Sequence, residues 1–269
     1  MLKMNRIEQK FNSLQKKNEK ALIGFVTAGD PDLKRSMEII GTMIDSGIDI
    51  LELGVPFSDP SADGPVIEQA CKRALANNVT IEDVLDMAGK IRKKTHIPII
   101  IFTYYNPVFA MGVENFCQKA LKNGADGVLI VDLPFEESDE ILRFKEAEKL
   151  CLIRLIAPLT PYKRMKMITK SASGFIYLIS KTGFTGSSGF DAKKTSLIAK
   201  NLRSSTSLPI CTGFGISTSD HVREVAAFSD GVVIGSAFVK IIEDNLENQR
   251  LLKILKHATI KFKNATKMD

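Results

Sequence analysis

Histidine and cysteine, the side chains that most often hold zinc, are scarce in this chain. It has three histidines and four cysteines in 269 residues. The cysteines, at positions 71, 117, 151 and 211, show no paired spacing, which argues against a disulfide framework or a zinc site and favours reduced thiols. His96, His221 and His257 do not stand at ligand spacing from a cysteine or an acid. We therefore expect no metal site.

Long apolar runs are also missing. The first residues, MLKMNRIEQKF, lack an apolar stretch of signal-peptide length, and no segment is long enough to span a membrane. We expect a soluble cytoplasmic protein, with a plastid stroma compatible if the chain is organelle-encoded. There is no tryptophan, and aromatic residues do not interleave the lysines. The net charge of +6 therefore indicates solvated helix faces rather than a nucleic-acid surface.

The chain alternates short apolar runs with longer helical stretches. The runs, rich in Ile, Val and Leu like covered parallel strands, are residues 22–27, 50–56, 97–103, 127–133, 152–157, 174–179, 208–213 and 231–234. Eight such units most simply close into an α/β fold, the (β/α)8 TIM barrel, and a doubly wound open sheet is the alternative. Residues 4–17 predict an extra N-terminal helix. No linker divides residues 1–269, which predicts a single domain.

Glu52 interrupts the second apolar run. Because side chains alternate along a strand, Glu52 lies on the opposite face from Leu51 and Leu53. Those two suit the covering helices, which places Glu52 inside the barrel. A carboxyl group there loses hydration, so its pKa rises toward the range useful for proton transfer. The alternative is a structural acid paired with a lysine or arginine inside the barrel.

The loop after this strand, PFSDPSADGP at 56–65, holds further acids. Its three prolines and one glycine restrict the backbone, so Asp59 and Asp63 are held in place. Active sites of such barrels lie at the C-terminal ends of the strands, where Asp132 also stands. A turn or capping role is the alternative for each acid.

Glycines gather in the second half of the chain. GFTGSSG at 183–189 has the length of a lid, Gly213 and Gly215 follow the seventh run, and Gly235 with Ser236 opens a short helical pattern after the eighth. Backbone N–H groups at glycines and a helix N-terminus attract anions, and this part of a barrel is a recurrent phosphate site. Tight turns are the alternative. The residues thus predict acid/base chemistry on a small phosphorylated molecule.

The ordered motifs resemble those of the tryptophan synthase alpha subunit family. The signature is LELGVPFSDP at 51–60, followed by ADGP at 62–65. Between about residues 11 and 242 it is joined by FVTAGDP at 25–31, Tyr104, Asn106, Phe109, Tyr177, Thr185 with Gly186, GFGI at 213–216, and Gly235 with Ser236. A single motif would be suggestive, whereas the ordered series is highly specific.

The resemblance implies a lyase that cleaves indole-3-glycerol phosphate by retro-aldol chemistry to indole and glyceraldehyde 3-phosphate, without a metal or cofactor in this chain. It implies that Glu52 is the acid/base and that Asp63 accepts the indole N–H hydrogen bond, which strengthens as that nitrogen becomes cationic. It also implies contacts to the substrate from Phe25, Tyr104, Tyr177 and Phe214, and to its phosphate from Gly186, Gly215, Gly235 and Ser236.

The family also implies a partner, a beta subunit that carries pyridoxal phosphate, in an alpha2beta2 complex. The residues implied at that interface are Asp59, Pro60, Asn106 and Pro107, and residues 106–111, expected as the loop after the third strand, would expose apolar side chains there. The chain departs from the family at Ser61, Lys181, Phe184 and Ser187-Ser188, where leucine, arginine, valine and a nearby arginine are usual. These departures concern lid closure and coupling to the beta subunit, not the reaction.

Three other readings are open. A stand-alone lyase of the same fold would release free indole without a beta subunit. A Schiff-base aldolase would use Lys181 as its nucleophile, although nothing nearby in the sequence lowers the pKa of that lysine. A third possibility is a barrel retained only to activate its partner, against which the presence of both Glu52 and Asp63 argues.

Overall fold

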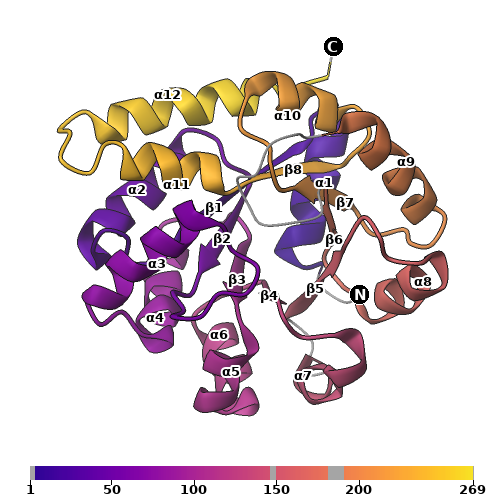
Figure 1. Ribbon diagram of the computed structural model, residues 1–269, viewed down its shortest axis with the longest axis horizontal. Coiled ribbons are helices and arrows are strands. Elements are labelled where there is room, and N and C mark those ends of the chain that lie inside the picture. Colours follow the sequence, from indigo (N-terminus) through magenta and orange to yellow (C-terminus); the bar gives the residue numbers. More distant parts are fainter. Residues whose placement is uncertain (1–3, 146–149, 181–190, 269) are drawn as a thin grey trace.

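In the computed structural model, eight parallel strands close into a barrel in chain order (Figure 1). The structure describes residues 4–145, 150–180 and 191–268. The strands are β1 (Ala21–Thr27), β2 (Ile50–Gly54), β3 (Ile99–Thr103), β4 (Gly127–Ile130), β5 (Cys151–Ile156), β6 (Ile176–Ile179), β7 (Ile210–Gly213) and β8 (Gly231–Ile234). The predicted TIM barrel is confirmed, and the open sheet is wrong, because β1 pairs with both β2 and β8.

Helices surround the barrel and cover the outer faces of its strands (Figure 1). In the described residues they are α2 (Leu33–Asp45), α3 (Pro65–Ala76), α4 (Ile81–Arg92), α5 (Tyr105–Met111), α6 (Val113–Lys122), the 3-10 turn η1 (Phe135–Glu137), α7 (Asp139–Lys145), α8 (Tyr162–Ser171), α9 (Ala192–Arg203), α10 (Ser219–Ala226), α11 (Ser236–Glu243) and α12 (Leu251–Asn264). The short helix predicted after the eighth strand is α11.

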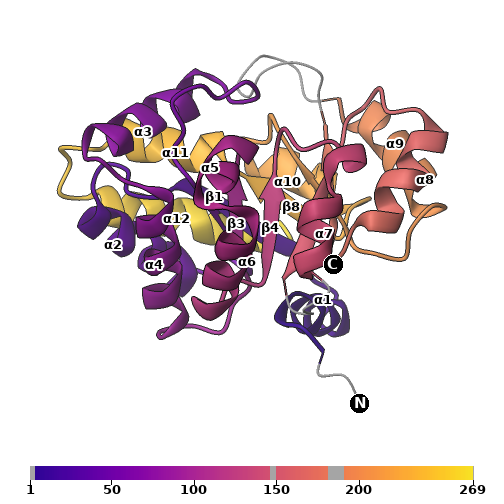
Figure 2. The ribbon, with the colours of Figure 1, turned by 90° about the horizontal axis from the view of Figure 1, so that it is seen from below.

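The extra N-terminal helix is α1 (Arg6–Lys16), which lies below the barrel in Figure 2. Its buried residues Ile7, Phe11 and Leu14 belong to the same cluster as the inward side chains of the strands. Buried Asp126 accepts from Arg6 of α1 at 2.7 Å and from Arg92 of α4 at 2.6 Å. The helix therefore closes the N-terminal end of the barrel and leaves the opposite end for the site.

Alternation along each strand separates two apolar layers. Leu51 and Leu53 pack in the layer under the helices, whereas Ile50 packs inside the barrel. The second and fourth apolar runs predicted strands as far as residues 56 and 133, but β2 ends at Gly54 and β4 at Ile130. Past Ile130 the chain turns back, and the N–H of Leu133 bonds to the carbonyl of Ile130 at 3.5 Å. The apolar residues there line the rim and do not extend the strand.

Candidate active site

Glu52 lies inside the barrel with no exposed surface. The register pairs it with Phe25 of β1 and Ile100 of β3, and burial raises its pKa to about 8. Among the described residues neither carboxyl oxygen has a hydrogen-bond partner. The alternative of a lysine or arginine partner therefore has no support in the described part of the chain. A carboxyl group in this state is protonated near neutral pH and can donate a proton.

Asp63 is the second buried acid, and its surroundings are polar. It lies in the loop between β2 and α3, and its Oδ2 accepts a hydrogen bond of 3.1 Å from the hydroxyl of Tyr104. That hydroxyl in turn accepts from the N–H of Ala62 at 3.1 Å, which fixes its direction. Burial raises the pKa of Asp63 to about 6, and the Tyr104 bond opposes the rise. Between about pH 6 and pH 8, Asp63 is therefore mostly ionised while Glu52 is still mostly protonated.

Aromatic rings enclose the space beside the two acids. Phe25 meets Phe102 edge to face at 5.1 Å between centroids, and Tyr177 meets Phe214 in the same manner at 5.9 Å. A Cβ on Gly54 would lie 2.7 Å from the ring of Phe25, so that strand position must lack a side chain. The structure thus brings the predicted residues Phe25, Tyr177 and Phe214 to one site.

The glycines after β7 and β8 meet at the same cavity. Gly215 has a left-handed backbone with φ of 74°, and Phe214 before it has φ of 77°. The hydroxyl of Ser180 donates to the carbonyl of Phe214 and holds this turn. Gly235 precedes the first turn of α11, where it offers no side chain to cap the helix. The free N–H groups at such a helix start attract an anion.

One cavity of about 30 Å³ joins these elements, and its lining includes Glu52, Asp63, Gly215, Gly235 and Ser236. Phe214 lines both this cavity and a larger one of about 740 Å³ beside it. Tyr104 lies outside the small cavity's lining and reaches the site through Asp63. Gly186 and Lys181, with Phe184, Ser187 and Ser188, lie outside the described residues.

A partly buried ion-pair network around Arg73 lies next to the site. Arg73 of α3 donates to Asp30, after β1, through Nε at 2.7 Å and Nη2 at 3.0 Å, and to Glu243 of α11 at 3.1 Å. Asp30 is only 3% exposed. Arg73 therefore links three elements around the site, the loop after β1, helix α3 and helix α11.

The residues expected at a partner interface lie at the rim near the site. Asp59 and Asn106 are exposed, and Pro60 and Pro107 are partly so. Asn106 and Pro107 belong to helix α5, where a loop was expected. Phe109 exposes 66% of its surface, as predicted for an apolar contact, but Val108 is fully buried, because the helix turns it toward the core.

Metal-ligand clusters of three or more His, Cys, Asp and Glu do not occur among the described residues. In the same residues no helix has the length and apolar character needed to cross a membrane. Asp132 lies at the rim as expected, but its Oδ1 accepts from the N–H of Tyr105 at 2.7 Å, which makes it a structural acid.

Two residues of this region were missed by sequence reasoning. Phe102 lines the small cavity, and the alternation that places Ile100 inside the barrel also predicts this position. Arg154 is a buried cation in the middle of β5, where a charge within an apolar run was the available signal.

Comparison with known proteins assigns the family. The family model described as tryptophan synthase alpha chain matches residues 11–267. The tryptophan synthase alpha chain of Desulfatibacillum aliphaticivorans is 53% identical over 264 residues, which cover 98% of this chain and 100% of the relative. The solved alpha subunit from Legionella pneumophila is 34% identical, with a TM-score of 0.90, over 98% of this chain and 99% of that one. Tryptophan synthase of Mycobacterium tuberculosis matches at 28% identity and a TM-score of 0.92, over 99% and 100%. The chain belongs to the tryptophan synthase alpha chain family, lyases that cleave indole-3-glycerol phosphate in tryptophan biosynthesis.

Proposed function

We propose that this chain cleaves indole-3-glycerol phosphate with Glu52 as proton donor and acceptor and Asp63 as the anion that stabilises the indole nitrogen. The observation that carries the proposal is the pair of buried acids that line one cavity, Glu52 without a hydrogen-bond partner among the described residues and Asp63 bonded to Tyr104. Burial alone raises the pKa of Glu52 to about 8, whereas Asp63, bonded to Tyr104, has a pKa of about 6. Two carboxyl groups whose environments separate their pKa values are suited to distinct acid and base roles.

The reaction proceeds by transfer of two protons and cleavage of one carbon–carbon bond. Protonated Glu52 donates to the indole ring carbon that carries the glycerol chain, and the ring nitrogen becomes cationic. Ionised Asp63 accepts the N–H hydrogen bond, which strengthens as that charge grows. The Glu52 carboxylate then removes the proton of the side-chain hydroxyl. The carbon–carbon bond breaks, its electron pair restores the indole ring, and the hydroxyl carbon becomes the aldehyde of glyceraldehyde 3-phosphate.

The binding groups fit the two ends of this substrate. The turn at Gly215 and the start of α11 at Gly235 and Ser236 would hold the phosphate through backbone N–H groups. Phe25, Tyr177 and Phe214 would enclose the ring.

The beta subunit is the proposed partner, and its pyridoxal phosphate would lie in that subunit and not in this chain. Solved relatives include tryptophan synthase from Mycobacterium tuberculosis, which supports an assembly of alpha and beta chains, proposed here as alpha2beta2. The exposed face formed by Asp59, Pro60, Asn106, Pro107 and Phe109 is the proposed contact. The bacterial relatives support a cytoplasmic location.

The test is indole release from indole-3-glycerol phosphate by the purified chain, alone and with a beta subunit. We expect slow turnover that rises strongly with the partner. Fast turnover that the partner does not change would favour a stand-alone lyase. Borohydride treatment with substrate should leave the chain active, since a trapped Schiff base would instead favour an aldolase that uses Lys181. No turnover under either condition would contradict the proposed reaction.

A further inference from the structure

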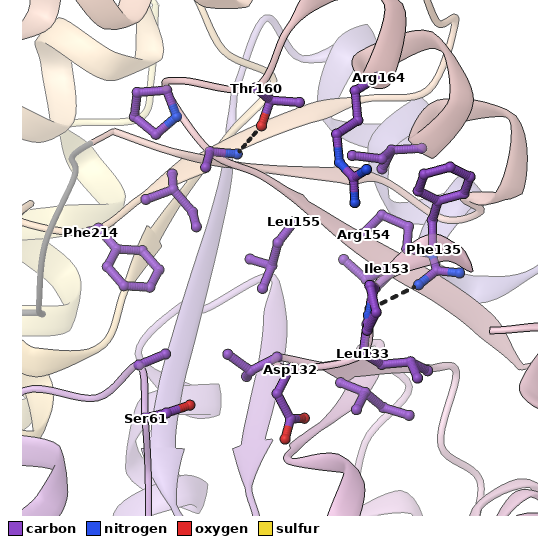
Figure 3. A pocket seen from close by; sticks show the side chains of 18 residues that line it. Ser61, Asp132, Leu133, Phe135, Ile153, Arg154, Leu155, Thr160, Arg164 and Phe214 are labelled. Carbon is purple, nitrogen blue, oxygen red and sulfur yellow. Dashed lines mark hydrogen bonds between the residues drawn. The ribbon is translucent and has the colours of Figure 1, made fainter. Parts of the chain in front are cut away.

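A cavity of about 740 Å³ opens between β4 and β5 (Figure 3). The two strands pair only as far as Leu129 and Ile153, whereas β5 continues to Ile156, so the barrel wall parts above that point. The lining includes the side chains of Leu155 and Phe214, which face the barrel interior, and that of Ile168 on α8, which packs against the outer faces of the strands. The cavity therefore runs from the mouth of the barrel through its wall toward α8.

Arg154 is the charged group buried at the outer part of this cavity. It is 5% exposed, and alternation on β5 points it away from the barrel interior. Its Nη1 donates to the carbonyl of Leu133 at 3.4 Å, the long contact drawn in Figure 3. Among the described residues its Nε and Nη2 have no hydrogen-bond partner. A guanidinium carries five donors in a planar fork, so most of its binding capacity is unused.

Among the described residues no acid forms an ion pair with Arg154, and the charge of Glu136 only partly offsets the effect of burial on its pKa. Glu136 is held by Arg164 through two hydrogen bonds of 2.5 and 2.9 Å, and Arg164 also lies 5.1 Å above the ring of Phe135. Asp132 lines the cavity but bonds to the N–H of Tyr105, and Figure 3 shows its side chain turned away from Arg154. Burial lowers the pKa of Arg154 to about 10, which leaves it cationic at neutral pH.

We propose that this cavity binds an organic anion with an apolar body, whose carboxylate or phosphate group is held by Arg154. An unpaired buried charge is unfavourable, and a bidentate oxyanion supplies the acceptors that Nε and Nη2 lack. Leu133, Phe135 and Ile168 give the apolar surface for the rest of the ligand. The site is separate from the proposed phosphate position at Gly215 and Gly235, and it does not depend on the cleavage reaction.

Binding can be followed at the arginine itself. The Nε–H signal of Arg154 in a 15N NMR spectrum is assigned by its absence in Arg154→Leu or Arg154→Lys. Benzoate and phenyl phosphate serve as carboxylate and phosphate probes, and benzyl alcohol is the uncharged control. We expect at least one anion to shift the Arg154 signal saturably and benzyl alcohol to leave it in place. An Arg154 signal that no anion moves would overturn the proposal.

The affinity for the effective anion is then measured by calorimetry in matched variants. Arg154→Leu should weaken it about tenfold or more, because it removes a charge-assisted bidentate contact. Arg164→Leu removes a cation that Glu136 already pairs, so the change should stay below about threefold. Equal losses in the two variants would mean non-specific attraction and contradict the proposal. If Arg154→Leu does not fold, Arg154→Lys decides, since it keeps the charge and loses the planar fork.

Discussion

Tyr104 donates a hydrogen bond of 3.1 Å to the carboxylate of Asp63, and this bond favours the ionised form of the acid. Glu52, in the same cavity, has no such partner among the described residues. The difference between the two surroundings is what separates their pKa values, and the predictions about pH follow from it.

The pH dependence of kcat/KM should be bell-shaped. Activity requires Asp63 ionised and Glu52 protonated, so the rate should fall below about pH 6 and above about pH 8. Tyr104→Phe removes the hydrogen bond to the charged form of Asp63, which raises its pKa and moves the acidic limb to higher pH. Tyr105→Phe is the control, because that hydroxyl bonds to exposed Glu140 outside the cavity. An acidic limb at the same pH in both variants would refute the role of Tyr104.

Protein stability should depend on Glu52 over a defined pH range. Its pKa is about 8 in the folded protein, against an ordinary value of 4.5, so the native state binds the extra proton between those values. Stability from this group is fully present below the lower value and is lost as pH rises through the higher one. Glu52→Gln should therefore gain stability relative to the parent protein as pH rises, by a few kcal/mol at most, on the order of the shift.

Urea unfolding of the two proteins across this pH range measures the effect. The exposed substitution Glu247→Gln serves as the control and should show no comparable trend. A stability difference for Glu52→Gln that stays constant from pH 5 to pH 9 would show that Glu52 has an ordinary pKa in the folded protein, because the expected change tracks its titration.

Gly213 is predicted to be required by the position of Tyr177. A Cβ there would overlap the hydroxyl of Tyr177, which is itself buried. Gly213→Ala should cost about 1–3 kcal/mol, as overpacked core positions do, and should lower kcat/KM by displacing the ring. Gly41→Ala in α2 is the matched control, because its Cβ would have no atom within 4 Å. Gly41→Ala should stabilise the protein by up to about 1 kcal/mol. Equal changes in thermal stability for the two variants would therefore count against this explanation.

The proposed phosphate site at the start of α11 is tested by the substitution Ser236→Asp. A carboxylate at the first position of α11 occupies the region of positive potential and repels the substrate phosphate. We expect KM for indole-3-glycerol phosphate to rise about tenfold or more, while the helix is not destabilised. Indole glycerol without the phosphate should be cleaved by both proteins with similar kcat/KM. A proportional loss with both substrates would instead place the phosphate elsewhere.

Much of this architecture can be read from the sequence because it depends on short-range pattern. The eight apolar runs predict the strands, and alternation alone places Glu52 inside the barrel. The pairing of Asp63 with Tyr104 could not be derived this way, because it joins residues 41 apart through the ends of two strands. Resemblance, and not pattern, supplied Tyr104 as a site residue.

Other features depend on contacts that no local pattern records. Residues 106–111 contain a proline and looked like a loop, yet α5 forms there with Pro107 near its start, where a missing N–H is tolerated. Arg154, with two donors that lack a partner among the described residues, follows Ile153, the last residue of β5 that pairs with β4. The end of that pairing is a property of the closed barrel and not of either strand.

The most direct test of the central claim compares Glu52→Gln with the parent protein in single-turnover cleavage of indole-3-glycerol phosphate, alongside activation of the beta subunit. Glutamine keeps the shape of the side chain but cannot transfer the proton. We predict loss of cleavage by about 100-fold or more, with activation of the beta subunit intact. Cleavage by Glu52→Gln within about threefold of the parent rate would contradict the assignment of Glu52 as the acid/base.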